Sequence, residues 1–459
     1  MKTFRINALT LASRNVRRSV RDYGVYFLTI VMGVAMFYVF NSIAEQGVMM
    51  ELSKNQAMML LGVNRIMSVL SVFIAAILGF LILYANAFLI RRRKKELGVY
   101  MTLGMKKGKV SQVLIYETAL VGIASLAAGL AAGIFVSQAC ALLTAKLFGV
   151  GLKAFAFIFS APALLKSIVY FGAAFLIVML FNTANISRRQ LVDLIYAEKK
   201  TEKFRAPRLG ASAGLFVISV IMLAAAYFLA FSAGVYLFGG VHYTVAVLGA
   251  AGTFLFFYAF SGFLLRLIPR FPGLRFKGLN LFTLGQLRSR MSSAHLTISF
   301  VCLMLLLSIT SISLGSALAE SIKGYDQREA GTVAAITYMS LYIGIVFMIA
   351  CASVLAIAQL SEASDNRSRY RLLAELGAGE KMLAGSLFRQ ILIYFALPLI
   401  LAVIHSAAAI AAMSKIIALI GEINIPATCL VSGLAIIALY GGYFLLTYLS
   451  ARNFARGGP

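Results

Sequence analysis

A short charged motif occurs twice in this chain, at residues 92–105 and 367–378. Each copy mixes basic and acidic residues, contains a Leu-Gly pair near its end, and lies between two long apolar runs. A basic helix of this kind can enter an acidic cleft on a soluble protein and hold there by an apolar anchor. Glycine adopts left-handed turns freely, so Gly104 and Gly377 are expected to end the two helices. The alternative is a solvated charge run that only closes a loop.

No arrangement of residues in the sequence favours catalysis or metal binding. There is no glycine-rich phosphate-binding loop, so any ATP that drives this protein would have to be bound by another chain. The three histidines are isolated and match no ligand spacing. The four cysteines form no Cys-x-x-Cys pair and are interpreted as small buried apolar residues. We therefore expect no metal, no cofactor and no enzymatic activity in this chain itself.

Two further groups of polar residues are candidate sites. Glu117 and its counterpart Gln390 lie at the start of apolar runs, where an ionisable group inside a membrane is costly and often functional. Pairing of Glu117 with a nearby Lys or Arg is the favoured interpretation. A lysine group around another apolar run offers positive charge to an anionic ligand such as a lipid-linked pyrophosphate, although anchoring at lipid headgroups is favoured. It comprises Lys146, Lys153 and Lys166.

The elements that carry these residues are predicted to be membrane-spanning helices. The chain is 61% apolar and only 13% charged, and runs of about 20 apolar residues are long enough to cross a bilayer. Ten such spans are predicted: 23–43, 66–90, 116–143, 163–183, 213–233, 244–265, 297–318, 334–360, 391–417 and 428–450. Within the third span, Gly129 and Gly133 form a GxxxG motif that predicts close helix packing.

The distribution of basic residues orients these spans. Of 42 Lys and Arg residues, 34 lie in the two terminal segments and in alternate connections. Because basic residues favour the cytoplasmic side, both termini are predicted to be cytoplasmic. The net charge of +26 then belongs mostly to one basic face, which suits anionic lipid headgroups rather than nucleic acid.

One offset of 273 residues aligns both charged motifs, pairing Gly104 with Gly377, and also pairs residues 7–19 with 280–292. This predicts an all-α membrane protein built from two parallel four-helix repeats, spans 1–4 and 7–10, with two inserted helices. An amphipathic arm, suited to the membrane interface, begins each half. The predicted segments are a cytoplasmic arm (1–22), a four-span unit (23–185), a basic connection (186–210), spans 5–6 (211–268), a second cytoplasmic arm (269–296) and a second four-span unit (297–459).

Residues 92–105, between two spans, resemble the charged segment of the FtsX-like permeases of ABC transporters. Residues 14–23 and 181–189 are similar to corresponding segments of the bacitracin-export, BceB-type branch of that family. The resemblance implies a multi-pass protein of the bacterial plasma membrane. It also implies a separate cytoplasmic ABC ATPase dimer, which holds the ATP and Mg²⁺ and docks on two coupling segments.

By position, the coupling segments are 91–109 and 367–382. The residues carried over to them are basic, acidic, leucine or glycine. They are Arg93, Lys94, Glu96, Gly98, Leu103 and Gly104 in the first copy, and Arg371, Glu375, Leu376 and Gly377 in the second.

The chain departs from the family pattern between spans 7 and 8. There the family carries a large extracellular domain, linked to peptide recognition and to a sensor histidine kinase, whereas residues 319–333 are too few to form one. Both of those implications are weakened. The expected function is export or removal of a membrane-active peptide antibiotic or its lipid target. The alternatives are force transmission to a cell-wall enzyme or sensor, and lipid or lipoprotein handling.

Overall fold

The computed structural model describes most of the chain and is entirely helical over the residues it describes. These are 7–18, 20–46, 96–147, 159–187, 209–233, 241–267, 278–321, 327–417 and 425–455, with isolated helical positions and pairs of positions between 71 and 93. Eight helices within these ranges are long and apolar enough to cross a membrane, and they coincide with the last eight predicted spans. The chain is therefore a multi-pass membrane protein. Of the first predicted span, residues 30–42 form an apolar helical stretch, and most of the second lies outside the described residues.

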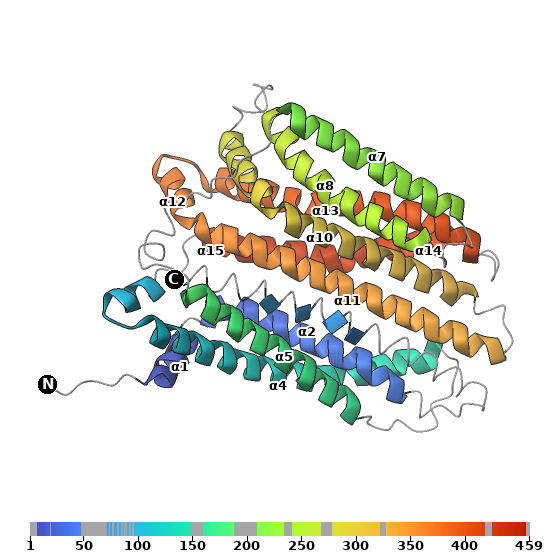
Figure 1. The fold of residues 1–459 in the computed structure, drawn as a ribbon, viewed down its shortest axis with the longest axis horizontal. Coiled ribbons are helices and arrows are strands. Elements are labelled where there is room, and N and C mark those ends of the chain that lie inside the picture. The colour runs from blue at the N-terminus through green and yellow to red at the C-terminus, as the bar shows by residue number, and fades with distance from the viewer. Residues whose placement is uncertain are drawn as a thin grey trace. The chain divides into compact units, whose positions relative to one another are not determined.

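The chain divides into two units, and the first contains residues 1–201 with 327–335. Three long helices pack together in it: α2 (Val20–Gln46), α4 (Lys107–Leu147) and α5 (Ala161–Ser187), as Figure 1 shows. The short helix α1 (Ala8–Arg18) packs on α4.

The GxxxG motif lets α2 and α4 approach closely, as the sequence predicted. A Cβ atom added to Gly129 would lie 2.6 Å from the Cβ of Val34, and one added to Gly133 would lie 3.0 Å from the carbonyl oxygen of Ala35. No larger residue fits at either position without a shift of the neighbouring helix. This contact fixes the helix from which Glu117 projects.

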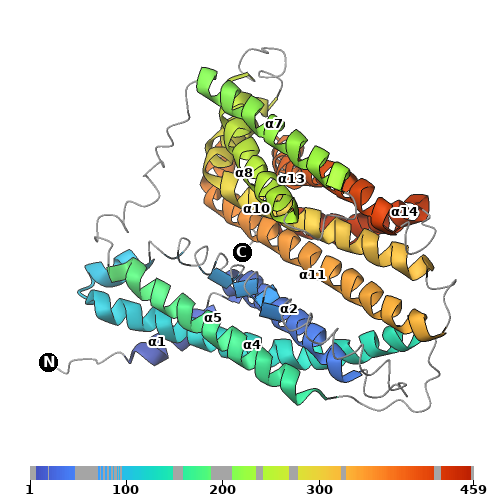
Figure 2. The same cartoon turned by 45° about the vertical axis from the view of Figure 1, so that its right-hand side comes forward.

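The second unit contains residues 202–326 and 336–459. Four of its helices contact one another in a closed ring: α7 (Leu209–Ala233), α8 (Val241–Leu267), α10 (Asn280–Ser321) and α13 (Glu380–Ile417). Figure 2 shows α7 and α8 lying along each other beside α10.

The unit also contains the part of α11 (Gln327–Asp365) that follows Ala335. The helices after it are α12 (Arg367–Glu375), α14 (Ile425–Ala435) and α15 (Gly442–Ala455), the last two joined by the π-helix η5 (Ile436–Gly441). α10 and α11 approach at Gly344, whose carbonyl accepts a hydrogen bond from the Ser308 hydroxyl.

Two features of α10 bear on the sequence predictions. The helix is continuous from Asn280 to Ser321, so the described part of the second predicted arm runs directly into the following span. Only residues 322–326 separate its end from the start of α11 at Gln327. Five residues are too few for a folded domain at this connection.

Candidate functional site

The first charged motif ends in a glycine-dependent turn. Residues 96–102 are helical, and Gly104 has a φ of 89°, in the left-handed region. The Gly104 N–H donates to the Met101 carbonyl at 3.1 Å, and the Met105 N–H donates to the Tyr100 carbonyl at 3.0 Å. This pair of bonds is the Schellman arrangement, which ends a helix by satisfying its last carbonyls. The segment is held to the start of α4 by Leu97, which packs on Val110 and Leu114.

The second motif ends in the same turn. α12 spans Arg367–Glu375, and Gly377 has a φ of 93°. The Gly377 N–H donates to the Ala374 carbonyl at 3.0 Å, and the Ala378 N–H donates to the Leu373 carbonyl at 2.9 Å. Each of these bonds lies 273 residues after its counterpart in the first motif. We call residues 96–105 the first turn and residues 367–378 the second turn.

Each turn exposes the leucine that directly precedes its glycine. Leu103, directly before Gly104, is 80% exposed, and Leu376, directly before Gly377, is 83% exposed. These are the two largest exposed fractions among the large apolar side chains of the described residues, and burying such a side chain against a partner would stabilise the contact by about 1.5–3 kcal/mol. Beside Leu376, Arg371 forms an exposed ion pair with Glu375, in which the guanidinium Nε lies 3.1 Å from a carboxylate oxygen.

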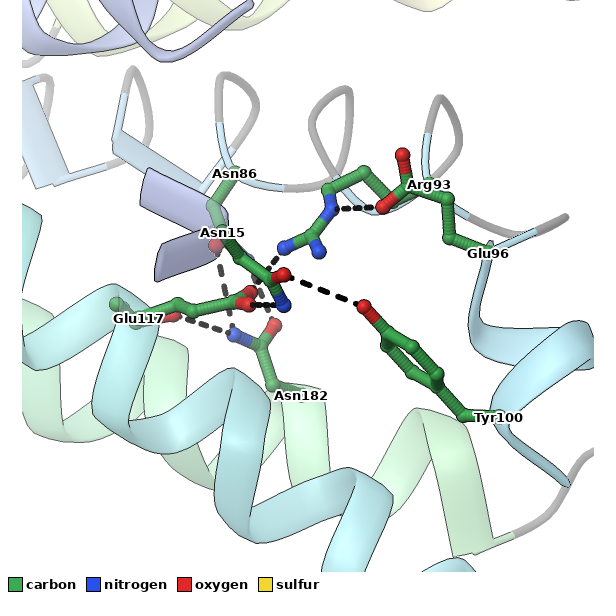
Figure 3. Close-up of polar contacts among 8 residues, drawn as sticks. Asn15, Asn86, Arg93, Glu96, Tyr100, Glu117 and Asn182 are labelled. Atoms are coloured by element: carbon green, nitrogen blue, oxygen red, sulfur yellow. Dashed lines mark hydrogen bonds and ion pairs between the residues drawn. The ribbon is translucent and has the colours of Figure 1, made fainter. Parts of the chain in front are cut away.

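A buried polar cluster lies behind the first turn (Figure 3), and we call it the first polar cluster. Arg93 and Glu117 form an ion pair between side chains that are 3% and 2% exposed. The other carboxylate oxygen of Glu117 accepts a hydrogen bond of 2.7 Å from the Asn15 amide on α1. Arg93 also donates from Nε to Glu96, at 3.0 Å, and the Tyr100 hydroxyl donates to the side-chain oxygen Oδ1 of Asn15, at 3.3 Å. The carboxylate on α4 is thus paired with a nearby basic residue, the interpretation that the sequence favoured.

A second layer of amides adjoins this cluster. Asn86 donates to Asn182 of α5 at 2.6 Å, and Asn182 donates to the Thr118 hydroxyl at 3.2 Å. All three side chains are buried. Because an unpaired buried amide is costly, these bonds fix how α4 and α5 face the segment that precedes the first turn.

A different buried cluster lies behind the second turn, and we call it the second polar cluster. Gln390 of α13 donates to Glu362 of α11 and accepts a hydrogen bond of 3.2 Å from the Tyr370 hydroxyl. Burial, followed by the nearby Glu362 charge, raises the pKa of Tyr370 to about 12, so the phenol is a neutral donor at physiological pH. Its ring packs edge-on against Phe282 of α10, with centroids 5.3 Å apart.

The predicted coupling residues differ in what they can contact. Glu96, Leu103, Arg371, Glu375 and Leu376 are exposed, as are both turn glycines, whereas Gly98 is buried. Arg93 is buried in its ion pair, so it holds the segment from behind and does not lie on the exposed surface of the turn.

Only one of the four lysines named in the sequence predictions has a described side chain. Lys94 and Lys153 lie outside the described residues, and the side chain of Lys146 is not described. Lys166 is exposed on α5. The candidate anionic-ligand site of Lys146, Lys153 and Lys166 therefore stays a prediction.

A third polar contact went unnoticed in the sequence. His405 of α13 is 4% exposed, and its two ring nitrogens contact the Tyr227 hydroxyl of α7 and the Thr253 hydroxyl of α8. Thr253 donates its only hydroxyl hydrogen to the Gly249 carbonyl, at 2.7 Å. It therefore accepts from His405 Nε2–H. The imidazole joins α7 and α8 to α13, and a lone histidine in an apolar run gave no signal of this contact.

The comparisons with known proteins agree with the motif analysis. Residues 68–190 match the family model described as the FtsX-like permease C-terminal domain. The chain is 27% identical over 326 residues to the bacitracin export permease protein BceB of Bacillus subtilis, covering 67% of this chain and 48% of that protein. It is 25% identical over 325 residues to the BceB of Halalkalibacterium halodurans, with shares of 67% and 47%.

A third relative, described as the uncharacterized ABC transporter permease YvcS of Bacillus subtilis, is 25% identical over 276 residues. That match covers 60% of this chain and 42% of the relative. The chain thus spans about half the length of the curated relatives it matches. Residues 68–190 include the first turn, Arg93 and Glu117, so the matched region contains every member of the first polar cluster except Asn15. Residues 68–190 therefore match an FtsX-like permease model, and about two thirds of the chain is similar in sequence to the BceB-type permeases.

Proposed function

We propose that this chain is the membrane subunit of a bacterial ABC transporter and that a separate cytoplasmic ABC ATPase dimer drives it. The observation that carries the proposal is the pair of turns with matching backbone hydrogen bonds, each presenting an exposed leucine. Two equivalent anchors suit a partner with two equivalent subunits, because each turn offers the same backbone surface. The match of residues 68–190 to an FtsX-like permease model supports this assignment.

The proposed architecture is ten spans in two parallel four-helix repeats, with α7 and α8 inserted between them and both termini in the cytoplasm. The equivalence of the two turns at one offset supports the repeat. The basic residues near the turns, together with the exposed arginines of α1, suit a cytoplasmic face lined by anionic lipid. We assign the substrate as a membrane-active peptide antibiotic, or the lipid target of one, because the relatives with this resemblance are named for bacitracin export.

The docking role is tested by purifying the tagged chain from its native membranes with its bound proteins. We expect an ABC ATPase to co-purify, and we expect ATP hydrolysis by the complex to require that subunit. The double variant Leu103→Ala, Leu376→Ala should lose the ATPase while remaining abundant in the membrane. The control is Leu180→Ala within the candidate span of α5, a leucine that is 71% exposed and belongs to neither turn. An ATPase retained by the double variant would exclude docking through these leucines.

The substrate assignment needs a separate experiment. Cells that lack the chain should become more sensitive to bacitracin, and expression of the chain with its ATPase should restore resistance. Unchanged sensitivity to bacitracin would exclude this peptide while leaving the docking result intact.

A further inference from the structure

We infer that Arg93, Glu117 and Asn15 are positioning residues that make the first turn, α1 and α4 move as one body when the ATPase pushes on the turn. This inference rests on the proposed function. It concerns residues behind the docking surface, none of which would touch the partner. Its basis is the closed path of polar contacts in the first polar cluster (Figure 3).

The path returns to the segment from which it starts. Tyr100 donates to Asn15 at 3.3 Å, Asn15 donates to Glu117 at 2.7 Å, and Glu117 pairs with Arg93. Tyr100 and Arg93 lie on the same segment, seven residues apart. The segment is therefore held at two points, through one amide on α1 and one carboxylate on α4.

Apolar contacts alone would not fix the segment in this way. Leu97 packs on Val110 and Leu114, but the hydrophobic effect is non-directional and tolerates sliding. Hydrogen bonds to ionised groups depend on angle as well as distance and are about twice as strong as neutral ones. The Arg93–Glu117 pair is nearly inaccessible to water, so it is screened much less than a surface pair would be.

Glu96 connects this path to the exposed surface. Its side chain is 53% exposed and accepts from Arg93 Nε at 3.0 Å, while a second nitrogen of the same guanidinium pairs with Glu117. One planar group thus joins an exposed carboxylate near the docking surface to a buried carboxylate on α4. Lysine cannot reproduce this contact, because it lacks the planar fork that addresses two carboxylates in fixed directions.

Docking of the ATPase and transmission of its movement should depend on different residues of the first turn and its surroundings. Docking should depend on Leu103, which lies on the exposed side of the turn. Transmission should depend on Asn15 and Tyr100, whose hydrogen bond belongs to the path of the first polar cluster. Loosening the cluster should therefore leave the ATPase bound to the chain but deprive the complex of coupled turnover.

The experiment uses the complex of the full chain with its co-purified ATPase. Two variants remove single contacts of the path: Asn15→Ala, and Tyr100→Phe, which keeps the ring and its packing. The control is Ser13→Ala on the same helix, because the Ser13 hydroxyl bonds only to the Thr10 carbonyl of α1 in the described structure. The measurements are ATPase co-purified per chain, and bacitracin-dependent ATP turnover per complex.

We expect both variants to retain the ATPase as the unchanged chain does. Their bacitracin-dependent turnover should fall about tenfold, as follows from losing one hydrogen bond in a path that ends on a charged group. Ser13→Ala should show neither effect. Arg93→Lys should reduce turnover as well, since it keeps the charge and loses the two-point contact.

Full turnover in both Asn15→Ala and Tyr100→Phe would overturn the inference. A parallel loss of turnover and of bound ATPase would also overturn it, because the cluster would then only shape the docking surface. If the unchanged chain binds no ATPase, the proposed function itself fails. The two failures are thus distinguished by the first measurement.

Discussion

The first and second turns share a backbone, but different side chains hold them in place. Both end on a glycine with φ near 90° and place a leucine that is at least 80% exposed before it. Behind the first turn lies an ion pair, Arg93 with Glu117, whereas behind the second an amide, Gln390, contacts a carboxylate and a phenol. The two turns thus share the glycine conformation and the exposed leucine, but the buried contacts behind them differ.

Positions that are equivalent at the 273-residue offset show how the support differs. Arg93 corresponds to Asn366, and Glu117 corresponds to Gln390, so both charges of the first ion pair are absent from these positions in the second half. Leu97 corresponds to Tyr370, and the two are buried alike, at 1% and 2% exposure. The comparison teaches that the glycine turn requires a fixed backbone, while the groups behind it need only be buried and satisfied.

The largest difference between the two halves should appear when one partner of a buried contact is removed. Glu117→Ala leaves the Arg93 charge buried without its main partner, which should cost about 3–5 kcal/mol of stability. Gln390→Ala removes a neutral amide and should cost about 1–3 kcal/mol. Reversible unfolding of the purified protein in detergent measures both. Equal losses would show that the buried ion pair contributes no more to stability than the neutral amide contact does.

Alkaline pH should distinguish the second turn from the first. Burial and the Glu362 charge raise the pKa of Tyr370 from 10.0 to about 12. The contribution of the neutral phenol to the free energy of unfolding is therefore fully present below pH 10. That contribution is lost as the pH rises through 12, because only the unfolded chain ionises readily. The shift corresponds to about 2–3 kcal/mol.

Tyr370→Phe should therefore flatten the fall in unfolding free energy between pH 10 and 12, relative to the unchanged chain. Leu97 has no titratable group, so Leu97→Met, an apolar replacement of similar volume, should leave the slope unchanged. A Tyr370→Phe variant with the original alkaline slope would contradict the role of burial at this phenol.

The two glycines should respond alike. Gly104→Val and Gly377→Val each force a β-branched residue to a φ near 90°, at a cost of about 1–3 kcal/mol. Neither glycine has an atom within 4 Å of an added Cβ, so the cost arises from the backbone and not from a clash. Thermal unfolding of both variants measures it.

Gly108→Ala and Gly385→Ala are the matched controls. Each lies in a helix with no neighbour within 4 Å of an added Cβ and without a positive φ. Both should stabilise the protein slightly, by about 0.5–1 kcal/mol. Unequal effects of the two valine variants would break the equivalence of the turns.

The smallest effect on stability is expected at the exposed leucines. Leu103→Ala and Leu376→Ala should each change the unfolding free energy by less than about 0.5 kcal/mol, since both side chains are mostly exposed in the folded protein. Each single variant should nevertheless reduce the amount of ATPase that co-purifies, and by similar factors. A large difference between the two factors would mean that the partner distinguishes the turns.

The sequence predicted the features that depend on local composition. Apolar run length placed eight described helices, and the Leu-Gly pairs placed both turns, because only glycine accepts the φ found at residues 104 and 377 without strain. The spacing of Gly129 and Gly133 predicted close helix packing, but not that the partner helix would be α2.

The polar clusters could not be predicted in the same way. Five consecutive basic residues, 91–95, give no indication of which one turns inward, and the rotation of the helix that buries Arg93 depends on its distant neighbour Glu117. Asn15 and Glu117 meet across 102 positions of sequence. Lipid and protein interior are both apolar, so a span's composition does not reveal which of its faces meets another helix. Glu362 and His405 escaped notice for that reason.

The unbroken course of α10 has a mechanical consequence. Its 42 residues make a rod about 63 Å long, roughly twice the thickness of the hydrocarbon core. Near one end of the rod, Phe282 packs on Tyr370, Thr283 bonds to Ser386 at 2.6 Å, and Asn280 bonds to Arg389. The second turn therefore contacts one end of a long helix that has no break along its length. A tilt of about 5° would swing the opposite tip by about 5 Å, close to one helical pitch.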